Sequence, residues 1–168
     1  MYDACVRIDT LLRGISSSDF QVNLQPKQEE ILLNHDFLIE GSNFAAAGMV
    51  STEIKSILKK IGLDPKLVRR VAISTYEGEM NVVMHAKRAK VGLAVTPRMI
   101  EVIIDDEGKG IPDVDLAMQE GFTTATEEMR AMGFGSGMGL PNIKRNSDKL
   151  NVKSEVGVGT TLEMKFFI

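Results

Sequence analysis

Residues 76–87 read YEGEMNVVMHAK, and this stretch decides the fold more than any other. Within it, Glu77, Asn81 and His85 recur every fourth residue, so a helix aligns them in one polar stripe beside an apolar face. Asn81 can offer an oxygen to a hard cation such as Mg²⁺, and Glu77 can accept a proton. This stripe indicates one edge of an active site, and the alternative is a solvated stripe on an amphipathic helix. Glu79 points to a different face, and we expect it in solvent.

The helix that carries this stripe is predicted to begin at Asp64-Pro65 and to run to Lys87, with aspartate as N-cap and proline at the first helical position. The apolar residues expected to face a sheet follow helical spacing: Val68, Ala72, Tyr76, Met80 and Val83. An earlier helix is predicted from Ser42 or Asn43 to about Ile61, and Gly62 follows its C-cap.

Strands are predicted on both sides of these helices. The segment HDFLIEG is predicted to be a short strand that ends at Gly41. The segments VGLAVT and MIEVIID are predicted to form an antiparallel hairpin about Pro97-Arg98. After a short helix in VDLAMQEG and another in PNIKRNSDKL, residues 150–168 form a closing hairpin. Strands at both ends with helices between them predict an α+β sandwich, in which helices cover one face of the sheet.

Length and composition fit one ordinary domain. The chain has 168 residues, of which 43% are hydrophobic and 26% charged. Its net charge of −3 creates no strong electrostatic field that would attract nucleic acid or anionic lipid. The lone Cys5 and two histidines exclude an intrachain disulfide and argue against a zinc site. Because the sequence shows no secretory signal and no apolar stretch long enough to span a membrane, we expect a cytoplasmic protein.

Residues 1–35 differ in sequence pattern from the rest of the chain and are predicted to be a helical appendage to a main domain at 36–168.

Two glycine-rich segments are candidates for ligand contact. In GFGSGMGLPNIKR, residues 133–145, alternating glycines precede a helix, and backbone N–H groups at such a place can bind phosphate oxygens. The alternative is a mobile surface loop that binds nothing. In IIDDEGKGIP, residues 103–112, Asp106 at a strand end can accept a hydrogen bond from an exocyclic amine such as that of adenine. An acidic turn without a ligand is the alternative there.

The order of these motifs resembles the ATP-binding domain shared by gyrase, the Hsp90 chaperone, histidine kinases and MutL, known as the Bergerat fold. Within that superfamily the chain most resembles the stand-alone anti-sigma factor serine kinases of bacteria. EGEMNVVMHA is similar to their N-box, DDEGKGIPD to the first glycine box, GSGMGL to the second and VGTT to the third. The resemblance covers residues 36–168 and implies a two-layer sandwich with a mixed, mostly antiparallel sheet.

The resemblance also implies roles for individual residues. Asn81 matches the Mg²⁺ ligand, Glu77 the general base that takes the proton of a protein serine, and Asp106 the residue that hydrogen-bonds adenine N6, supported by Thr160 or Thr161. The predicted lid over ATP spans about Phe122 to Gly137 and is longer than in those kinases. The full predicted ATP-binding set is Asn81, His85, Asp106, Gly108, Gly110, Ile111, Thr123, Arg130, Gly135, Gly137, Gly139, Leu140, Thr160 and Thr161.

Two functions remain open from the sequence. One is a serine/threonine protein kinase, with ATP and Mg²⁺ as cofactors, that phosphorylates a partner regulatory protein. The other is an ATP-dependent switch that controls a partner and transfers little or no phosphate. The presence of Glu77 favours the kinase. By resemblance the partner is a sigma factor or an anti-sigma antagonist, and a homodimer is left open.

Overall fold

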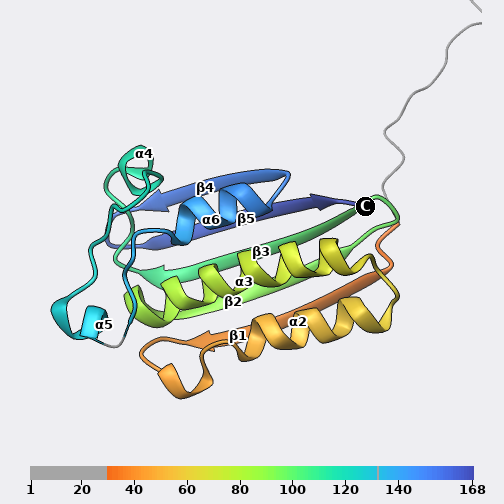
Figure 1. The fold of residues 1–168 in the computed structure, drawn as a ribbon, viewed down its shortest axis with the longest axis horizontal. Helices are drawn as coiled ribbons and strands as arrows, with labels where there is room; N and C mark the ends of the chain where they lie inside the picture. The colour runs from red at the N-terminus through yellow and green to blue at the C-terminus, as the bar shows by residue number, and fades with distance from the viewer. Residues whose placement is uncertain (1–29, 132) are drawn as a thin grey trace, which may run out of the picture.

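The computed structural model describes residues 30–131 and 133–168, which form a sheet with a layer of helices on one face (Figure 1). The strands are β1 (Leu33–Glu40), β2 (Ala86–Val95), β3 (Met99–Gly108), β4 (Lys149–Glu155) and β5 (Gly159–Phe167). The helices are the 3-10 turn η1 (Phe44–Ala46), α2 (Met49–Lys60), α3 (Pro65–His85), α4 (Val114–Ala117), α5 (Glu127–Ala131) and α6 (Gly139–Asn146). The α+β sandwich expected from the sequence is therefore confirmed.

The sheet has the strand order β1-β2-β3-β5-β4, and within the described part of the chain every neighbouring pair is antiparallel. The mixed sheet that the resemblance implied is therefore wrong for the described residues. The hairpins predicted at Pro97-Arg98 and near the C-terminus are both present. Of the predicted appendage at 1–35, residues 1–29 lie outside the described residues, and β1 already begins at Leu33.

Helix α3 lies over the middle of the sheet and brings its motif residues, 76–85, next to β3 (Figure 1). Val68, Val71 and Val82 are almost fully buried in the core. Gly78 permits a close approach, because a Cβ at this position would lie 2.5 Å from Cδ1 of Ile104 on β3. The C-terminal half of α3 is thus fixed next to the strand end that carries the first glycine box.

The helix boundaries agree with the sequence at some ends and differ at others. Asp64 caps α3 as predicted, since its carboxylate accepts from the N–H groups of Lys66 and Leu67. Asn43 instead caps the short η1, and α2 begins only at Met49, because Gly48 adopts φ +89° and interrupts the helix.

Two further sequence expectations about α3 are wrong. The helix ends at His85 rather than Lys87, because Ala86 is extended and already belongs to β2. Tyr76 does not face the sheet: it is 43% exposed. The face of α3 that packs on the sheet instead includes Ser74 and Gly78, two small residues that the apolar spacing does not mark.

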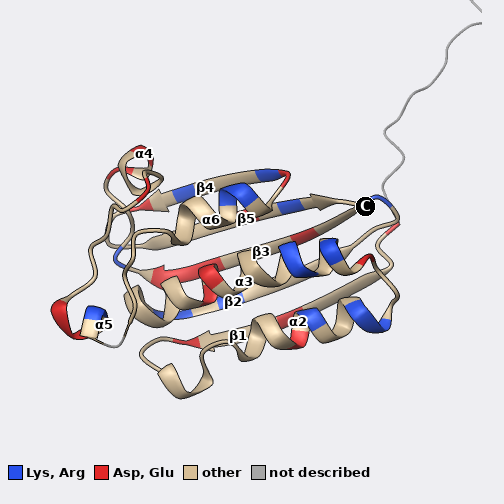
Figure 2. Ribbon diagram, viewed as in Figure 1, with Lys and Arg blue, Asp and Glu red and all other residues tan. Residues whose placement is uncertain are grey.

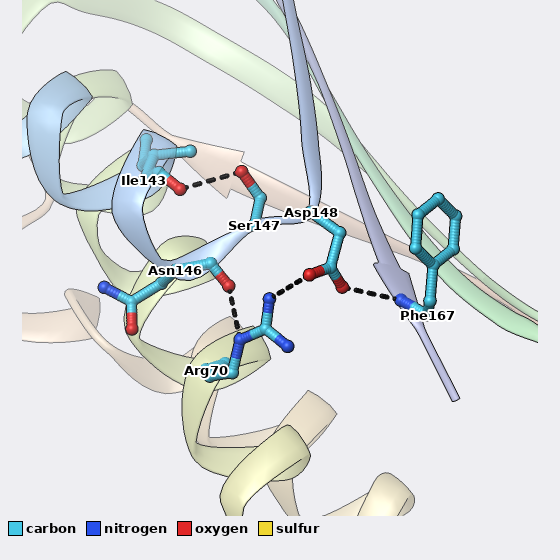
Figure 3. A network of polar contacts seen from close by, with 6 residues as sticks. All are labelled: Arg70, Ile143, Asn146, Ser147, Asp148 and Phe167. Carbon is cyan, nitrogen blue, oxygen red and sulfur yellow. Dashed lines mark hydrogen bonds and ion pairs between the residues drawn. The ribbon is translucent and has the colours of Figure 1, made fainter.

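Helix α6 is attached to α3 and to the end of β5 through one ion pair (Figure 3). The Arg70 guanidinium donates to Oδ1 of Asp148 at 2.6 Å and to the carbonyl of Asn146 at 2.9 Å. Oδ2 of Asp148 accepts the N–H of Phe167 at 2.8 Å. The hydrogen bond from Arg70, together with that from Phe167, lowers the pKa of Asp148 below its ordinary value. This network fixes the C-terminal end of α6.

Charge is distributed unevenly along the helix layer. Figure 2 shows basic residues gathered where α2 ends and α3 begins, away from α5. They include Lys59, Lys60 and Lys66. Acidic residues are found near the other end of the sheet, where β3 ends and α5 lies (Figure 2). None of the described helices has the length and apolar character needed to cross a bilayer.

Candidate functional site

A cavity of about 560 Å³ opens between the C-terminal half of α3, the end of β3, the start of α6 and the segment that connects α4 to α6. Glu77, the predicted general base, lines it. So do most residues of the predicted ATP-binding set: Asn81, His85, Asp106, Gly108, Gly110, Ile111, Thr123, Gly135, Gly137, Gly139, Leu140 and Thr160. The fold therefore brings together residues that lie as far apart in the sequence as positions 77 and 160.

Two residues of the predicted set do not line the cavity. Arg130 lies on α5 and is absent from the lining. Thr161 pairs in register with Asp105 and donates its hydroxyl to that carboxylate at 2.7 Å. Because successive residues of a strand point to opposite faces, Thr160 is the one directed to the cavity and 161 is not. Of the two threonines left open by the sequence, Thr160 fits the position beside Asp106.

Asp106 occupies the end of the cavity formed by β3 and β5. Its Oδ1 accepts the backbone N–H of Thr160 at 3.1 Å. Burial raises the pKa of Asp106 above its ordinary value, although the N–H groups of Thr160 and Gly108 oppose the shift. A half-buried carboxylate held by backbone donors is suited to accept a hydrogen bond from a planar ligand.

The first glycine box lies directly against the β4–β5 turn. Gly110 has φ +71°, and a Cβ there would come within 2.2 Å of the Glu155 carbonyl oxygen. The N–H of Ile111 donates to Oγ of Ser154 at 2.7 Å, and that hydroxyl also lies 2.8 Å from Oγ1 of Thr160. Glycine at 110 is thus required for the loop to reach this position and form the wall of the cavity.

Glu77, Asn81 and the start of α6 meet at the other end of the cavity. A Cβ on Gly139 would lie 3.3 Å from Oδ1 of Asn81 and 3.7 Å from Oε2 of Glu77. Nδ2 of Asn142, one turn into α6, donates to Oε1 of Glu77 at 2.7 Å. The carboxylate and the carboxamide oxygen of the polar stripe therefore both face the first residue of the helix that follows the glycine run.

The predicted lid, residues 122–137, is closed at its base by two glycines. The N–H of Gly121 donates to the Gly137 carbonyl at 3.0 Å, and a Cβ on Gly137 would come within 2.4 Å of the Gly121 carbonyl carbon. Phe134 lines the cavity and stacks on Phe44 of η1 with ring centroids 5.7 Å apart. Its position within a glycine run is the sequence signal that could have identified it.

Lys109 is the single basic side chain among the described residues that line the cavity. Burial lowers the pKa of His85 below its ordinary value, and the positive charge of Lys109 lowers it further. His85 is thus favoured in its neutral form. The negative charge of a polyphosphate would be met mainly by backbone N–H groups rather than by a cluster of basic side chains.

The expectation that Glu79 lies in solvent is wrong. Its side chain is buried, and its two oxygens accept the N–H groups of Val50 at 3.1 Å and of Ser51 at 3.0 Å. These are first-turn donors of α2, whose N-cap residue Gly48 makes no side-chain hydrogen bond. Glu79 therefore caps a neighbouring helix whose own first turn contains no acidic residue.

Comparison with known proteins identifies the family. A family profile described as the histidine kinase-like ATPase domain matches residues 42–166. The chain belongs to this family. The match confirms the resemblance drawn from the four motifs, and ATP is the nucleotide of the histidine kinase-like ATPase domain.

The chain is also similar to individual named proteins. An anti-sigma F factor of Caldanaerobacter subterraneus subsp. tengcongensis is 37% identical over 113 residues, which cover 63% of this chain and 76% of that protein. The serine/threonine-protein kinase RsbT of Bacillus subtilis is 26% identical over 113 residues, which cover 65% of this chain and 79% of that protein. This chain is thus similar both to a protein named as an anti-sigma factor and to a protein named as a serine/threonine-protein kinase.

Solved structures show the same fold. The SiaB-SiaC complex from Pseudomonas aeruginosa contains a chain that matches with a TM-score of 0.54 and 14% identity, covering 97% of this chain and 100% of that one. The structure of the RsbU and RsbW domains of Rv1364c from Mycobacterium tuberculosis matches with a TM-score of 0.53 and 15% identity. That match covers 79% of this chain and 32% of the other, so this chain spans about a third of its length.

Proposed function

We propose that this histidine kinase-like ATPase domain is a serine/threonine protein kinase that transfers the γ-phosphate of ATP to a serine of a partner regulatory protein. The observation that carries the proposal is that Glu77 and Asn81 both face Gly139, at the start of the helix that follows the glycine run. A proton acceptor is thereby placed where the phosphates of a nucleotide would end. The names of the relatives, among them a serine/threonine-protein kinase, agree with this chemistry.

The nucleotide orientation follows from the two ends of the cavity. Asp106 would accept the adenine amine, and the loop at Gly110 would pass beside the base. The backbone N–H groups of residues 135–139 and the first turn of α6 would bind the phosphate oxygens, since such donors and the helix dipole favour anions. The lid at 122–137 would close over the phosphates.

Mg²⁺ fits beside Asn81 in this arrangement. Mg²⁺ in phosphate sites takes few protein oxygens and completes its shell with phosphates and water. Oδ1 of Asn81 faces Gly139, where any side chain would occupy the space that such a ligand needs. Bound there, Mg²⁺ would neutralise charge on the phosphate oxygens. We expect Asn81→Ala to reduce Mg²⁺-dependent ATP binding far more than metal-free binding, and equal losses in calorimetry would contradict the metal role.

In the transfer step Glu77 would act on the acceptor hydroxyl. The serine oxygen forms a bond to the γ-phosphorus while the bond from that phosphorus to the β–γ bridging oxygen breaks, and ADP leaves with this oxygen. The proton of the serine hydroxyl passes to the Glu77 carboxylate. Positioning and charge neutralisation supply most of the rate enhancement in phosphoryl transfer, and a base contributes less where the transition state is loose.

The proposal is tested with purified protein, Mg²⁺, γ-labelled ATP and candidate anti-sigma antagonists encoded near its gene, with phosphoserine mapped by mass spectrometry. We expect Glu77→Gln to keep ATP affinity within about twofold, because the amide retains the shape and one acceptor oxygen. Transfer should fall by about 10²-fold or more, the usual contribution of a positioned base. Wild-type protein that binds ATP and a partner but phosphorylates none would favour the ATP-dependent switch.

A further inference from the structure

Asn142 makes a contact that neither the four motifs nor the family assignment accounts for. Its side-chain nitrogen donates to Oε1 of Glu77 at 2.7 Å, between two residues that are 65 positions apart. An ionised carboxylate can only accept hydrogen bonds, so the amide nitrogen rather than its oxygen must face Glu77. A charge-assisted bond of this length is stronger than an ordinary one and restricts the orientation of the carboxylate.

The contact leaves the two oxygens of Glu77 in different surroundings. Oε1 is occupied by Asn142, whereas Oε2 faces Gly139, where a built Cβ would lie 3.7 Å away. A general base needs an oxygen with a free lone pair within reach of the proton it takes. Oε2 is the better placed of the two, because it lies on the side of the glycine run, whereas Oε1 already accepts the hydrogen bond from Asn142.

Asn142 is itself held rigidly. It lies on the first turn of α6, where its N–H donates to the carbonyl of Met138 at 2.8 Å, and the adjacent Ile143 is fully buried. The other end of α6 is fixed by Arg70, whose Nε donates to the Asn146 carbonyl at 2.9 Å. A donor on a fixed helix can hold a flexible glutamate in one rotamer, as precise catalytic geometry requires.

We propose that Asn142 is the positioning residue for the base: it holds Glu77 by Oε1, directs Oε2 to the phosphate end of the cavity, and couples the base to the helix that follows the glycine run. This proposal rests on the proposed function for its catalytic part. Its structural part, the contact between the two side chains, stands independently and has a separate test.

The structural part is tested by NMR of the nucleotide-free protein. We expect the side-chain N–H₂ of Asn142 to have one proton shifted downfield, because it bonds a carboxylate, and to lose that shift in Glu77→Ala. The matched control is Asn146, whose side chain donates to the Asn142 carbonyl at 2.9 Å and does not contact Glu77. An Asn142 side-chain signal that is unchanged in Glu77→Ala would overturn the proposal.

The catalytic part is tested by transfer to the acceptor protein identified in the labelling experiment. We expect Asn142→Ala to lower kcat by about tenfold, the effect of roughly one positioning hydrogen bond, with the Kd for ATP unchanged within about twofold. Asn142→Gln keeps an amide donor and should restore part of the rate. Asn142→Asp should be worst, because two carboxylates repel each other. The control Asn146→Ala should keep the wild-type rate.

A double variant separates positioning from general damage. If Asn142 acts through Glu77, Glu77→Gln combined with Asn142→Ala should be no slower than Glu77→Gln alone. Multiplied losses, or a wild-type kcat in Asn142→Ala and Asn142→Asp, would overturn the positioning role. If wild-type protein transfers no phosphate, the proposed function and the catalytic part fall together, and the NMR comparison still decides whether Asn142 holds Glu77.

Discussion

Removing the Glu79 carboxylate should cost this protein a large part of its stability without touching the cavity. The side chain is 1% exposed and lies on α3 between Glu77 and Asn81, but it points to α2. It accepts two backbone N–H groups, from Val50 at 3.1 Å and Ser51 at 3.0 Å. Both donors belong to the positive end of the α2 dipole, where a carboxylate is most favourable.

The expected magnitude follows from these contacts. A hydrogen bond to a charged group contributes about 1.5–3 kcal/mol, and Glu79→Ala leaves two buried N–H groups without an acceptor. We therefore expect Glu79→Ala to lower the free energy of unfolding by about 3–5 kcal/mol, which is a large share of the usual 5–15 kcal/mol. Glu79→Gln keeps one acceptor oxygen and should cost about half as much. For a chain of this size, the Tm should fall by about 10 °C in the alanine variant.

Chemical denaturation followed by circular dichroism measures this directly. Glu53, an exposed glutamate on α2, provides the matched control, and Glu53→Ala should change the free energy of unfolding by less than about 0.5 kcal/mol. Equal midpoints for Glu79→Ala and Glu53→Ala would refute the reasoning, because they would mean that the first turn of α2 gains nothing from the buried carboxylate.

Three further predictions concern the cavity and its lid. Gly137→Ala should lower ATP affinity in calorimetry at least tenfold more than Gly133→Ala. Both glycines have positive φ, but only a Cβ at position 137 would lie against Gly121. Similar losses of affinity in the two variants would contradict the closed lid base. Asp106→Asn should weaken ATP binding yet raise the Tm of the nucleotide-free protein. Because the pKa of Asp106 is raised in the folded state, the folded protein binds more protons than the unfolded protein at pH values above the ordinary pKa. Ionising this carboxylate at neutral pH therefore lowers the free energy of unfolding. An unchanged ATP affinity would remove Asp106 from the site. Because the pKa of His85 is lowered in the folded state, the unfolded protein binds more protons below about pH 6.5, and the free energy of unfolding should fall on acidification from pH 7. His85→Gln should flatten this dependence of the free energy of unfolding on pH, measured from denaturation curves. The same pH dependence in wild type and variant would contradict the prediction.

The sequence predicted those parts of the fold that depend on local chemistry. Asp64 accepts from the first turn of α3, Gly62 adopts φ +81° after α2, and the hairpin at Pro97-Arg98 forms. Each of these depends on residues within a few positions of one another. Local caps and turns are readable because their physical cause lies inside a short window.

The parts that failed depend on contacts distant in sequence. Glu79 is a charged residue on a helix, and only the position of α2, 28 residues earlier, makes it a buried cap. The choice between Thr160 and Thr161 depends on which face of β5 meets the cavity, and sequence alternation does not say which face that is. Asn142 meets Glu77 only because α6 packs against α3.

The two ends of the cavity differ in how firmly the fold holds them, and this bears on how a nucleotide enters. At the Asp106 end, the walls are strands and a loop joined by hydrogen bonds through Ser154 and Thr160. The lid has few such contacts: among its described residues Ala125 is the one buried apolar side chain. Regions with few buried contacts open at the lowest free energy. The Asp106 end, where we propose that adenine binds, is therefore formed in advance, and the predicted lid is the part expected to open for ATP. Changes at Gly137 should therefore affect entry and release of nucleotide more than recognition of the base.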